Sequence, residues 1–508
     1  MEEKELNTPV GYKYIEEYLK NKNIEVFPYF RESYIRKSGV TKITETPEKI
    51  TYYYLKKYQP EDTLFSQLEF ALRNEGVNLE IIEKLFQVLP EEEIKNYINK
   101  SIKGKYTRII WFLYEWLTDK KLDLPDIPRV NYISLLDDKL YFTTRPNKLK
   151  RYCLNENLLG NRNFCPFVRK TYIIKDYETK NLKDKAEKII ERYDYNTILR
   201  ASSYLYAKET RSSYEIERER PNKKRAAKFI IALQGVDSMD QLSKKMLLEL
   251  QNIIVESPFA DKDYRKDQNY MGETIGAIER IHYVSPKPED IEGLMKGLLD
   301  CYQRLIDSDV PSVIIATVIS FGFVFIHPFS DANGRIHRFL IHYILSKKGF
   351  TPPNTIFPVS AAILEDIKGY DSILESFSKK IVPLIDYELN NSLELTVNNE
   401  TLSYYKYIDF TSCVEYLYRI IDHIIEYDFE NEIIFLINYD KSKSEMQEIL
   451  DMPDRLADLF IKVVIQNKGI LSINKRKEHF DMLNDDQIHD LEQIIQKKFD
   501  QCNQDKTD

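Results

Sequence analysis

The sequence predicts a mainly α-helical protein, and three observations lead to that prediction. Val313 to Ile326 is an almost continuous apolar run after Pro311, which suits the first turn of a helix because proline lacks an N–H and has a fixed φ. Further on, apolar residues recur at helical spacing before a Lys-Lys-Gly stop signal: Ile336, Phe339, Leu340, Tyr343 and Ile344. The chain also has 36 tyrosines and only 15 glycines. We therefore expect a fold built mostly from buried helices.

Length and composition exclude several classes of protein. A chain of 508 residues suffices for about three domains. Its 43 % of hydrophobic residues exclude a mainly disordered protein. A net charge of −8 argues against a dominant nucleic-acid-binding surface. The apolar run at 313–326 is too short to span a bilayer, and Thr317, Ser320 and Gly322 interrupt it. Neither a nucleic acid nor a membrane is an expected partner.

The termini and the cysteines suggest a compartment. The first residues, Met-Glu-Glu-Lys-Glu, lack the basic region and apolar core of a secretory signal. The five cysteines are odd in number and form no Cys-x-x-Cys pair, which favours reduced thiols over disulfides or a zinc site. We expect a cytoplasmic protein and leave a homo-oligomer open.

Breaks in the pattern divide the chain into three regions. Residues 1–185 are expected to be mostly helical and include the apolar stretch Trp111–Leu117, a predicted buried helix. Residues 186–390 carry the segments with chemical character. Asn390-Asn391 and Asn398-Asn399 mark a boundary, after which residues 391–508 return to helical periodicity.

The densest chemistry of the chain lies at residues 327–338, His-Pro-Phe-Ser-Asp-Ala-Asn-Gly-Arg-Ile-His-Arg. We interpret this segment as a loop that runs into a helix near Gly334, where free N–H groups and the helix dipole favour an anion. Gly334 lets the backbone approach a phosphate closely. Arg335 and Arg338 lie three residues apart on one helical face and can reach the same anion. The segment therefore predicts a polyphosphate site.

Two further residues of this segment suit a phosphate reaction. Asp331 offers a hard oxygen ligand for Mg²⁺, which usually binds one or two carboxylates together with substrate phosphates. His327 has an ordinary pKa near 6.5, so at pH 7 it can accept a proton. A zinc site from His327, His337 and His342 is the rival interpretation, but their spacing fits neither a loop clip nor an i, i+4 helix pair.

The same residues closely resemble the motif of the Fic family (filamentation induced by cAMP), His-x-Phe-x-(Asp/Glu)-Gly-Asn-Gly-Arg-x-x-Arg. Ala332 replaces the usual glycine, a change that costs little unless this residue needs a positive φ. The resemblance implies a helical bundle with a small β-hairpin flap, flanked by largely helical regions. It also implies transfer of AMP from ATP to a Ser, Thr or Tyr hydroxyl of a protein, possibly this protein itself.

The resemblance also assigns roles to the residues of the motif. His327 would take the proton of the attacking hydroxyl, and Asp331 would hold Mg²⁺ against the α- and β-phosphates. Asn333 would contact the α-phosphate, while Gly334, Arg335 and Arg338 would bind the remaining phosphates of ATP. Nothing in the sequence identifies the base pocket, for which Tyr370 is only a guess.

An upstream segment resembles the hairpin flap of the same family. Residues at about 268–286 run from Gln268-Asn269-Tyr270-Met271-Gly272 to Ile281-His282-Tyr283-Val284-Ser285-Pro286. In the family this flap clamps the target by strand addition, which grips any sequence through the backbone. Gly272, Ile281 and Tyr283 are our candidates for target docking. The alternative is an edge hairpin that only covers the core.

A third segment resembles the family's inhibitory motif, (Ser/Thr)-x-x-x-Glu-(Gly/Asn), in the arrangement where it precedes the catalytic core. Ser213 and Glu217, in a predicted helix at about 210–220, share one helical face. The family's glutamate pairs with the second arginine of the motif, here Arg338, and competes with the γ-phosphate. Arg218 replaces Gly or Asn, and we expect arginine to favour continuing the helix.

Two other functions stay open on sequence alone. The same scaffold could use another donor or direction, through UMP, phosphate or phosphocholine transfer or removal of AMP. A protein of another class, a non-catalytic regulator that senses nucleotide and binds DNA or protein, is the second alternative. The presence of His327 argues against it, because a sensor needs no base there.

Overall fold

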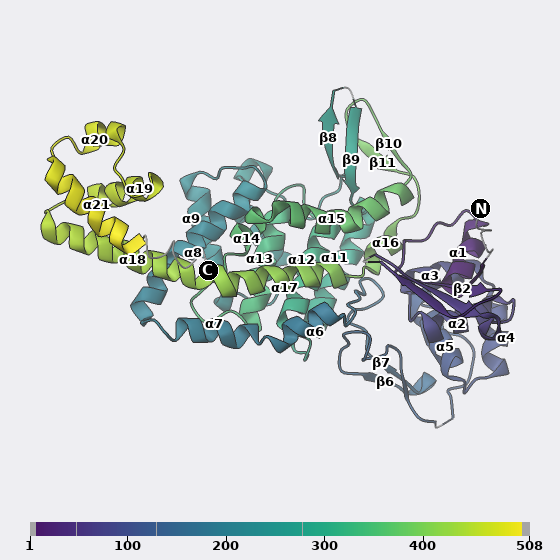
Figure 1. The fold of residues 1–508 in the computed structure, drawn as a ribbon. Helices are drawn as coiled ribbons and strands as arrows, with labels where there is room; N and C mark the ends of the chain where they lie inside the picture. Colours follow the sequence, from purple (N-terminus) through teal and green to yellow (C-terminus); the bar gives the residue numbers. More distant parts are fainter. Residues whose placement is uncertain (1–6, 47, 129, 277, 500–508) are drawn as a thin grey trace.

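A computed structural model describes residues 7–46, 48–128, 130–276 and 278–499, and within them the chain forms three large hydrophobic cores, together with a small cluster of Val10, Ile35 and Phe70. The first core joins residues between Tyr12 and Phe167, the large central core runs from Phe142 to Ile433, and the third covers Met446 to Ile495. Figure 1 shows the corresponding bodies side by side along one elongated molecule. The predicted, mainly helical fold is confirmed.

The N-terminal region contains a sheet that the sequence analysis missed. Four strands pair in the order β1-β2-β4-β3, with β2 and β4 parallel: β1 (Thr8–Val10), β2 (Arg31–Arg36), β3 (Lys42–Glu45) and β4 (Ile50–Leu55). Five helices pack beside the sheet: α1 (Tyr12–Lys20), α2 (Leu64–Asn74), α3 (Leu79–Val88), α4 (Glu91–Lys100) and α5 (Lys105–Thr118). The buried helix predicted at 111–117 lies inside α5, where Trp111 is fully buried.

A connecting segment links the first two cores. It contains a small sheet of β5 (Ile133–Ser134), β6 (Asn147–Leu149) and β7 (Leu154–Glu156), followed by α6 (Tyr172–Thr179) and α7 (Leu182–Ile190). Ile174 and Leu182 are buried in the central core. The predicted boundary at 185 therefore falls within the central body, because α6 and α7 already pack on it.

Helices α12 and α13 form the middle of the central body. Helix α12 (Ser312–Ile326) begins directly after Pro311, is buried from Val313 to its end, and packs against α11 (Pro288–Ile306), α13 (Asn333–Lys347) and α17 (Thr411–His423). The other central helices are α8 (Tyr195–Ile216), α9 (Lys223–Gln234), α10 (Lys244–Ile254), α14 (Val359–Glu365) and α15 (Ile367–Ile381). A hairpin of β8 (Tyr270–Ile275) and β9 (Ile278–Val284) projects from this body (Figure 1).

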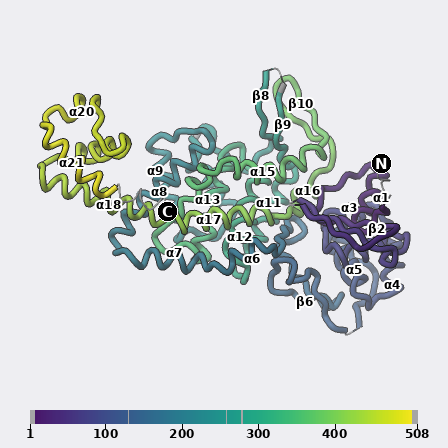
Figure 2. Tube along the Cα trace, viewed as in Figure 1, coloured from purple at the N-terminus to yellow at the C-terminus, as the bar shows by residue number. Residues whose placement is uncertain are grey.

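The C-terminal part differs from its predicted boundary at 390. Strands β10 (Tyr387–Leu389) and β11 (Leu395–Val397), helix α16 (Leu402–Lys406) and α17 all contribute to the central core. A π-helical turn at Ile424–Asp428 continues α17 into α18 (Phe429–Ile449), and Figure 2 shows this long rod leading away from the core. The third core forms only where α19 (Asp454–Gln466), α20 (Ile473–His479) and α21 (Asp485–Phe499) pack against the end of α18.

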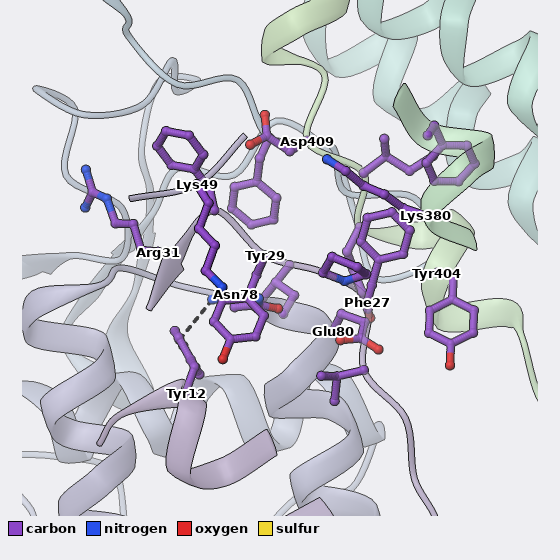
Figure 3. Close-up of a pocket in the computed structure, with 18 of the residues that line it drawn as sticks. Tyr12, Phe27, Tyr29, Arg31, Lys49, Asn78, Glu80, Lys380, Tyr404 and Asp409 are labelled. Atoms are coloured by element: carbon purple, nitrogen blue, oxygen red, sulfur yellow. Dashed lines mark hydrogen bonds between the residues drawn. The ribbon is translucent and has the colours of Figure 1, made fainter. Parts of the chain in front are cut away.

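A cavity of about 440 Å³ lies between the N-terminal region and the central body and is lined by residues of both. Its lining includes Tyr12 and Glu80 of the N-terminal region and Lys380 and Tyr404 of the central body, all labelled in Figure 3. No residue of the 327–338 segment lines it. Among the described helices, none is both long and apolar enough to cross a membrane.

Candidate active site

In the 327–338 segment, residues 327–332 form a tight loop between two buried helices, and residues 333–338 begin the second helix. Helix α12 ends at Ile326 and is capped by His327, whose N–H donates to the carbonyl oxygen of Phe323 at 2.9 Å, and α13 starts at Asn333. The amide of Asn333 closes the loop: its Oδ1 accepts from the N–H of Phe329 at 3.0 Å, and its Nδ2 donates to the carbonyl of Phe329 at 2.8 Å. In this structure Asn333 shapes the loop, and its contact with an α-phosphate stays a prediction.

Both ends of the loop require left-handed backbone at residues that are not glycine. His327 has a φ of 53° and Ala332 a φ of 73°. A Cβ in this region costs roughly 1–2 kcal/mol. Ala332, which replaces the usual glycine, therefore does need a positive φ. The substitution thus strains the backbone at this position, although alanine is the smallest replacement for glycine.

The surroundings of His327 fix it as a neutral proton acceptor. Its Nδ1 lies 3.1 Å from the carbonyl oxygen of Val324, and because a carbonyl can only accept, Nδ1 carries the proton and Nε2 the lone pair. Burial lowers the pKa of His327 to about 4, with the carbonyl of Val324 opposing and the cation of Arg265 adding to that shift. The ring is thus neutral at pH 7, as a general base must be.

The two arginines of the motif are both buried at the start of α13. Arg335 is 1 % exposed, and its guanidinium donates to Glu219 at 2.9 Å and to Asp331 at 2.7 Å. Arg338, also 1 % exposed, donates to Glu217 Oε1 at 2.8 Å, to the Ser213 hydroxyl at 3.0 Å and to the Ser213 carbonyl at 2.7 Å. Nε of Arg335 and Nη1 of Arg338 are buried without a hydrogen-bond partner among the described residues. Each of these two N–H groups can still donate a hydrogen bond to an anion.

The carboxylate of Glu217 occupies the anion site that the sequence predicts. A Cβ built on Gly334 would lie only 2.1 Å from Glu217 Oε1, so this carboxylate sits directly on the backbone at the start of α13. Burial by itself would lower the pKa of Arg338, but Glu217 and Tyr370 raise it above its ordinary value. The structure thus joins Ser213 and Glu217 to Gly334 and Arg338, two pairs that are more than a hundred positions apart in sequence.

The end of helix α8 differs from our expectation for Arg218. The helix stops at Ile216, and Arg218 adopts a φ of 57° instead of continuing it. The N–H of Glu219 bonds to the carbonyl of Tyr214 at 3.0 Å, and that of Arg218 bonds to the carbonyl of Glu215 at 2.9 Å. These two bonds define a Schellman turn, which usually has glycine where Arg218 stands. Tertiary contacts therefore overrule the helix preference of arginine.

Glu219 is the site residue that the sequence analysis missed. The Schellman turn brings Glu219 beside Arg335 while Glu217 meets Arg338, so two carboxylates cover two arginines. Glu217 and Glu219 would point to different faces of a continued helix, since two residues correspond to about 200°. Only a turn that breaks the helix between them can align both, and no residue pattern in this segment predicts such a turn.

Asp331 lies at the open side of the site. Its side chain is 52 % exposed, and one carboxylate oxygen accepts from Arg335 and from the N–H of Ala332. A half-exposed carboxylate beside buried cationic donors fits Mg²⁺, because this ion keeps several waters and takes only one or two protein oxygens.

The zinc interpretation receives no support from the arrangement of the histidines. His327, His337 and His342 do not form a metal-binding group among the described residues, where the only such group joins Glu365, His423 and Asp428. His342 pairs with buried Glu209 at 2.7 Å. His337 lies 4.6 Å from the ring of Phe321 and 6.1 Å from that of Tyr370. Tyr370 is itself buried in this stack, beside Arg338.

We expect His337 to weaken the protein in acid. Burial lowers its pKa in the folded protein to about 3 from an ordinary 6.5, so between these values the unfolded chain binds the extra proton. Its contribution to stability is complete above pH 6.5 and is lost as the pH falls. Between pH 7 and pH 5 the loss should be about 2 kcal/mol, measured by urea unfolding. The His337→Phe variant cannot titrate at this position, so its free energy of unfolding should fall by about 2 kcal/mol less than that of the wild type over the same pH range. An equal fall in both proteins would contradict the low pKa of His337.

The predicted hairpin is present, and its candidate residues differ in exposure. A register shift lies between Met271 and Gly272, and a Cβ on Gly272 would lie 2.8 Å from the carbonyl of Arg280, so only glycine fits there. Ile281 is partly buried. Tyr283 is buried, and its hydroxyl donates to the carbonyl of Phe325. Tyr283 thus anchors the hairpin to the end of α12, while the docking of a target on the hairpin stays a prediction.

The fold and the site define a mainly helical protein in which a neutral, buried histidine precedes a helix start with two buried arginines. Residues 241–345 match the family model described as the Fic/DOC family. The matched residues include the hairpin and the whole 327–338 segment. This segment of the chain is similar to that family. Residues 213–219 lie outside it.

Curated relatives carry the description "Protein adenylyltransferase Fic". The chain is 29 % identical over 114 residues to the protein of Drosophila willistoni, 30 % over 132 residues to that of Culex quinquefasciatus, and 36 % over 70 residues to that of Nematostella vectensis. These alignments cover 22 %, 25 % and 14 % of this chain, and 21 %, 24 % and 16 % of the relatives. The chain thus matches at most about a quarter of each relative's length.

Two solved structures resemble the chain more loosely. A Fic family protein from Desulfovibrio desulfuricans has a TM-score of 0.36 at 16 % identity, over 61 % of this chain and 87 % of its own. A Fic domain containing signaling protein from Bacteroides thetaiotaomicron has a TM-score of 0.35 at 20 % identity, over 49 % of this chain and 95 % of its own.

Proposed function

We propose that this protein is a protein adenylyltransferase that moves AMP from ATP to a Ser, Thr or Tyr hydroxyl of a protein. One observation carries the proposal: a neutral imidazole with its proton on Nδ1 lies at the end of α12, and two buried arginines and the backbone of Gly334 lie one short loop away, at the start of α13. That arrangement suits an attack on a phosphate by a hydroxyl whose proton the imidazole takes. The names of the curated relatives support the same reaction.

Each residue of the site has a distinct part in the proposed reaction. Nε2 of His327 accepts the proton as the hydroxyl oxygen bonds to the α-phosphorus, and the bond from that phosphorus to the bridging oxygen breaks, so pyrophosphate leaves. Arg335 and Arg338 bind the β- and γ-phosphates, and the N–H groups at Asn333 and Gly334 face the phosphate chain. Asp331 would hold Mg²⁺, which supplies positive charge against the phosphates.

We further propose that the described conformation is autoinhibited. The carboxylate of Glu217 lies on Gly334 and pairs with Arg338, the two groups that the γ-phosphate needs. Glu219 pairs with Arg335 in the same way. ATP must displace both carboxylates before its phosphates can bind as the reaction requires, and Ser213 holds Arg338 in place for Glu217.

We place the reaction in the cytoplasm. Four described cysteines, Cys153, Cys165, Cys301 and Cys413, are free and buried, which suits a reducing compartment. The hairpin with its exposed strand β8 supports a protein as the substrate, because an unpaired strand edge can bind an extended segment.

Labelled ATP tests this function directly. Glu217→Gly protein incubated with Mg²⁺ and α-labelled ATP should transfer label to protein, either to itself or to a target in a lysate, whereas γ-labelled ATP should transfer none. Label from the γ position would indicate phosphate transfer instead. No transfer from either position would overturn the proposal and favour a nucleotide-sensing regulator.

A further inference from the structure

Arg265 is a buried cation without an acidic partner among the described residues. The residue is 5 % exposed, and burial lowers its pKa to about 10. Burying an unpaired charge costs several kcal/mol unless other groups compensate for it. Here the compensation comes from backbone carbonyls and one hydroxyl, so the choice of arginine at this position requires an explanation beyond packing.

The guanidinium of Arg265 connects three separate segments of chain. Nε donates to the carbonyl of His327 at 2.8 Å, and Nη1 donates to the carbonyl of Asp267, just before β8, at 2.7 Å. Nη2 donates to the hydroxyl of Ser285 at 2.8 Å and to the carbonyl of Pro286 at 2.7 Å, just after β9. The two ends of the hairpin and the loop at 327–332 therefore all form hydrogen bonds with the side chain of Arg265.

The backbone of Arg265 strengthens this connection. Its N–H donates to the carbonyl of Pro328 at 2.8 Å, so residues 327 and 328 are each held by one bond. His327 is the residue with left-handed backbone at the end of α12, and such a conformation persists only where the surrounding structure enforces it. Arg265 supplies two of the bonds that enforce it.

We infer that Arg265 is a positioning residue that holds the backbone of His327 and couples it to the target-binding hairpin. This inference rests on the proposed function. A target that binds to the hairpin shifts the hairpin roots, and the guanidinium passes that shift to the catalytic loop. A misplacement of the base by about 1 Å can cost on the order of 100-fold in rate.

The charge of Arg265 adds a second, measurable effect. Among charged groups, Arg265, Glu217 and Asp331 have the largest effects on the pKa of His327. Both carboxylates favour the protonated ring, and only Arg265 among these three opposes it. Removing this cation should therefore shift the titration of His327 to higher pH.

NMR titration of histidine-labelled protein tests the charge effect without any enzymatic assay. In Arg265→Met the imidazole signals of His327, assigned by their loss in His327→Ala, should titrate at higher pH than in the wild type. In Arg265→Lys, which keeps the charge, they should stay close to the wild type. Lys266→Met removes a neighbouring exposed charge and should change nothing. An unshifted His327 in folded Arg265→Met would overturn the inference.

Kinetics test the positioning effect in Glu217→Gly protein. Both Arg265→Lys and Arg265→Met should lower kcat on the order of 100-fold per folded molecule, while the KM for ATP changes less than about twofold. A residue with only a structural role would lower the melting temperature and leave kcat per folded molecule unchanged, which would refute positioning. If Glu217→Gly itself transfers no AMP, the proposed function fails, and the NMR titration still decides the placement of Arg265.

Discussion

Glu217→Gly protein should transfer AMP 10- to 100-fold faster than the wild type at saturating ATP. In the wild type the carboxylate of Glu217 pairs with Arg338 at 2.8 Å and lies against the backbone of Gly334. A charge-assisted bond of this kind is worth roughly 1.5–3 kcal/mol, which corresponds to about 10- to 100-fold. Removing the carboxylate frees both the arginine and the start of α13 for the γ-phosphate.

The neighbouring glutamates provide the controls. Glu215 is exposed and lies two residues before Glu217, about 200° away around the helix. Glu215→Gly should therefore leave the rate of transfer unchanged. Glu219→Gln should add to the effect of Glu217→Gly, because it releases Arg335 from its 2.9 Å pair. Equal rates for the wild type and Glu217→Gly would remove the inhibitory role. Equal rates for Glu217→Gly and for the double variant with Glu219→Gln would confine the inhibitory role to Glu217.

His327→Ala should lower AMP transfer by Glu217→Gly protein by a factor of about 100 to 10,000, the usual contribution of a general base. Nε2 is the free nitrogen of a ring whose other nitrogen is held by Val324, and no phosphate-binding role falls to it. ATP binding, measured by calorimetry, should therefore change less than about twofold. His489→Ala, in the exposed part of α21, is the matched control and should retain full activity.

The pH dependence of the active variant gives a second readout for His327. The neutral ring is the active form, and burial lowers its pKa to about 4, so protonation removes the base only as the pH falls toward that value. Activity lost to protonation of His327 should thus be absent between pH 8 and pH 6. A descending limb centred near pH 6.5 that vanishes in His327→Ala would contradict a buried, neutral base.

The sequence determined the helices around the site and its chemistry, because both depend on short-range patterns. The apolar run at 313–326 could only be buried, and the predicted helix start near Gly334 lies at Asn333. The order of histidine, carboxylate and arginines within a dozen residues places these groups on one short loop and the first turns of the helix that follows it. By contrast, the strands of the N-terminal sheet were missed, since Arg31–Arg36 and Ile50–Leu55 pair across a gap in the chain and carry no clear alternation.

Only the tertiary structure decided what these groups contact. The sequence placed Glu217 on a helix with Ser213, but Arg338 stands 121 residues away, and packing of α8 against α13 brings the three together. The position of Glu219 depends on a Schellman turn at Arg218, a conformation that local preference disfavours and surrounding contacts impose. No sequence pattern predicts the position of the Arg265 guanidinium, because three of its four partners are backbone carbonyls, which every residue possesses and only the fold can orient.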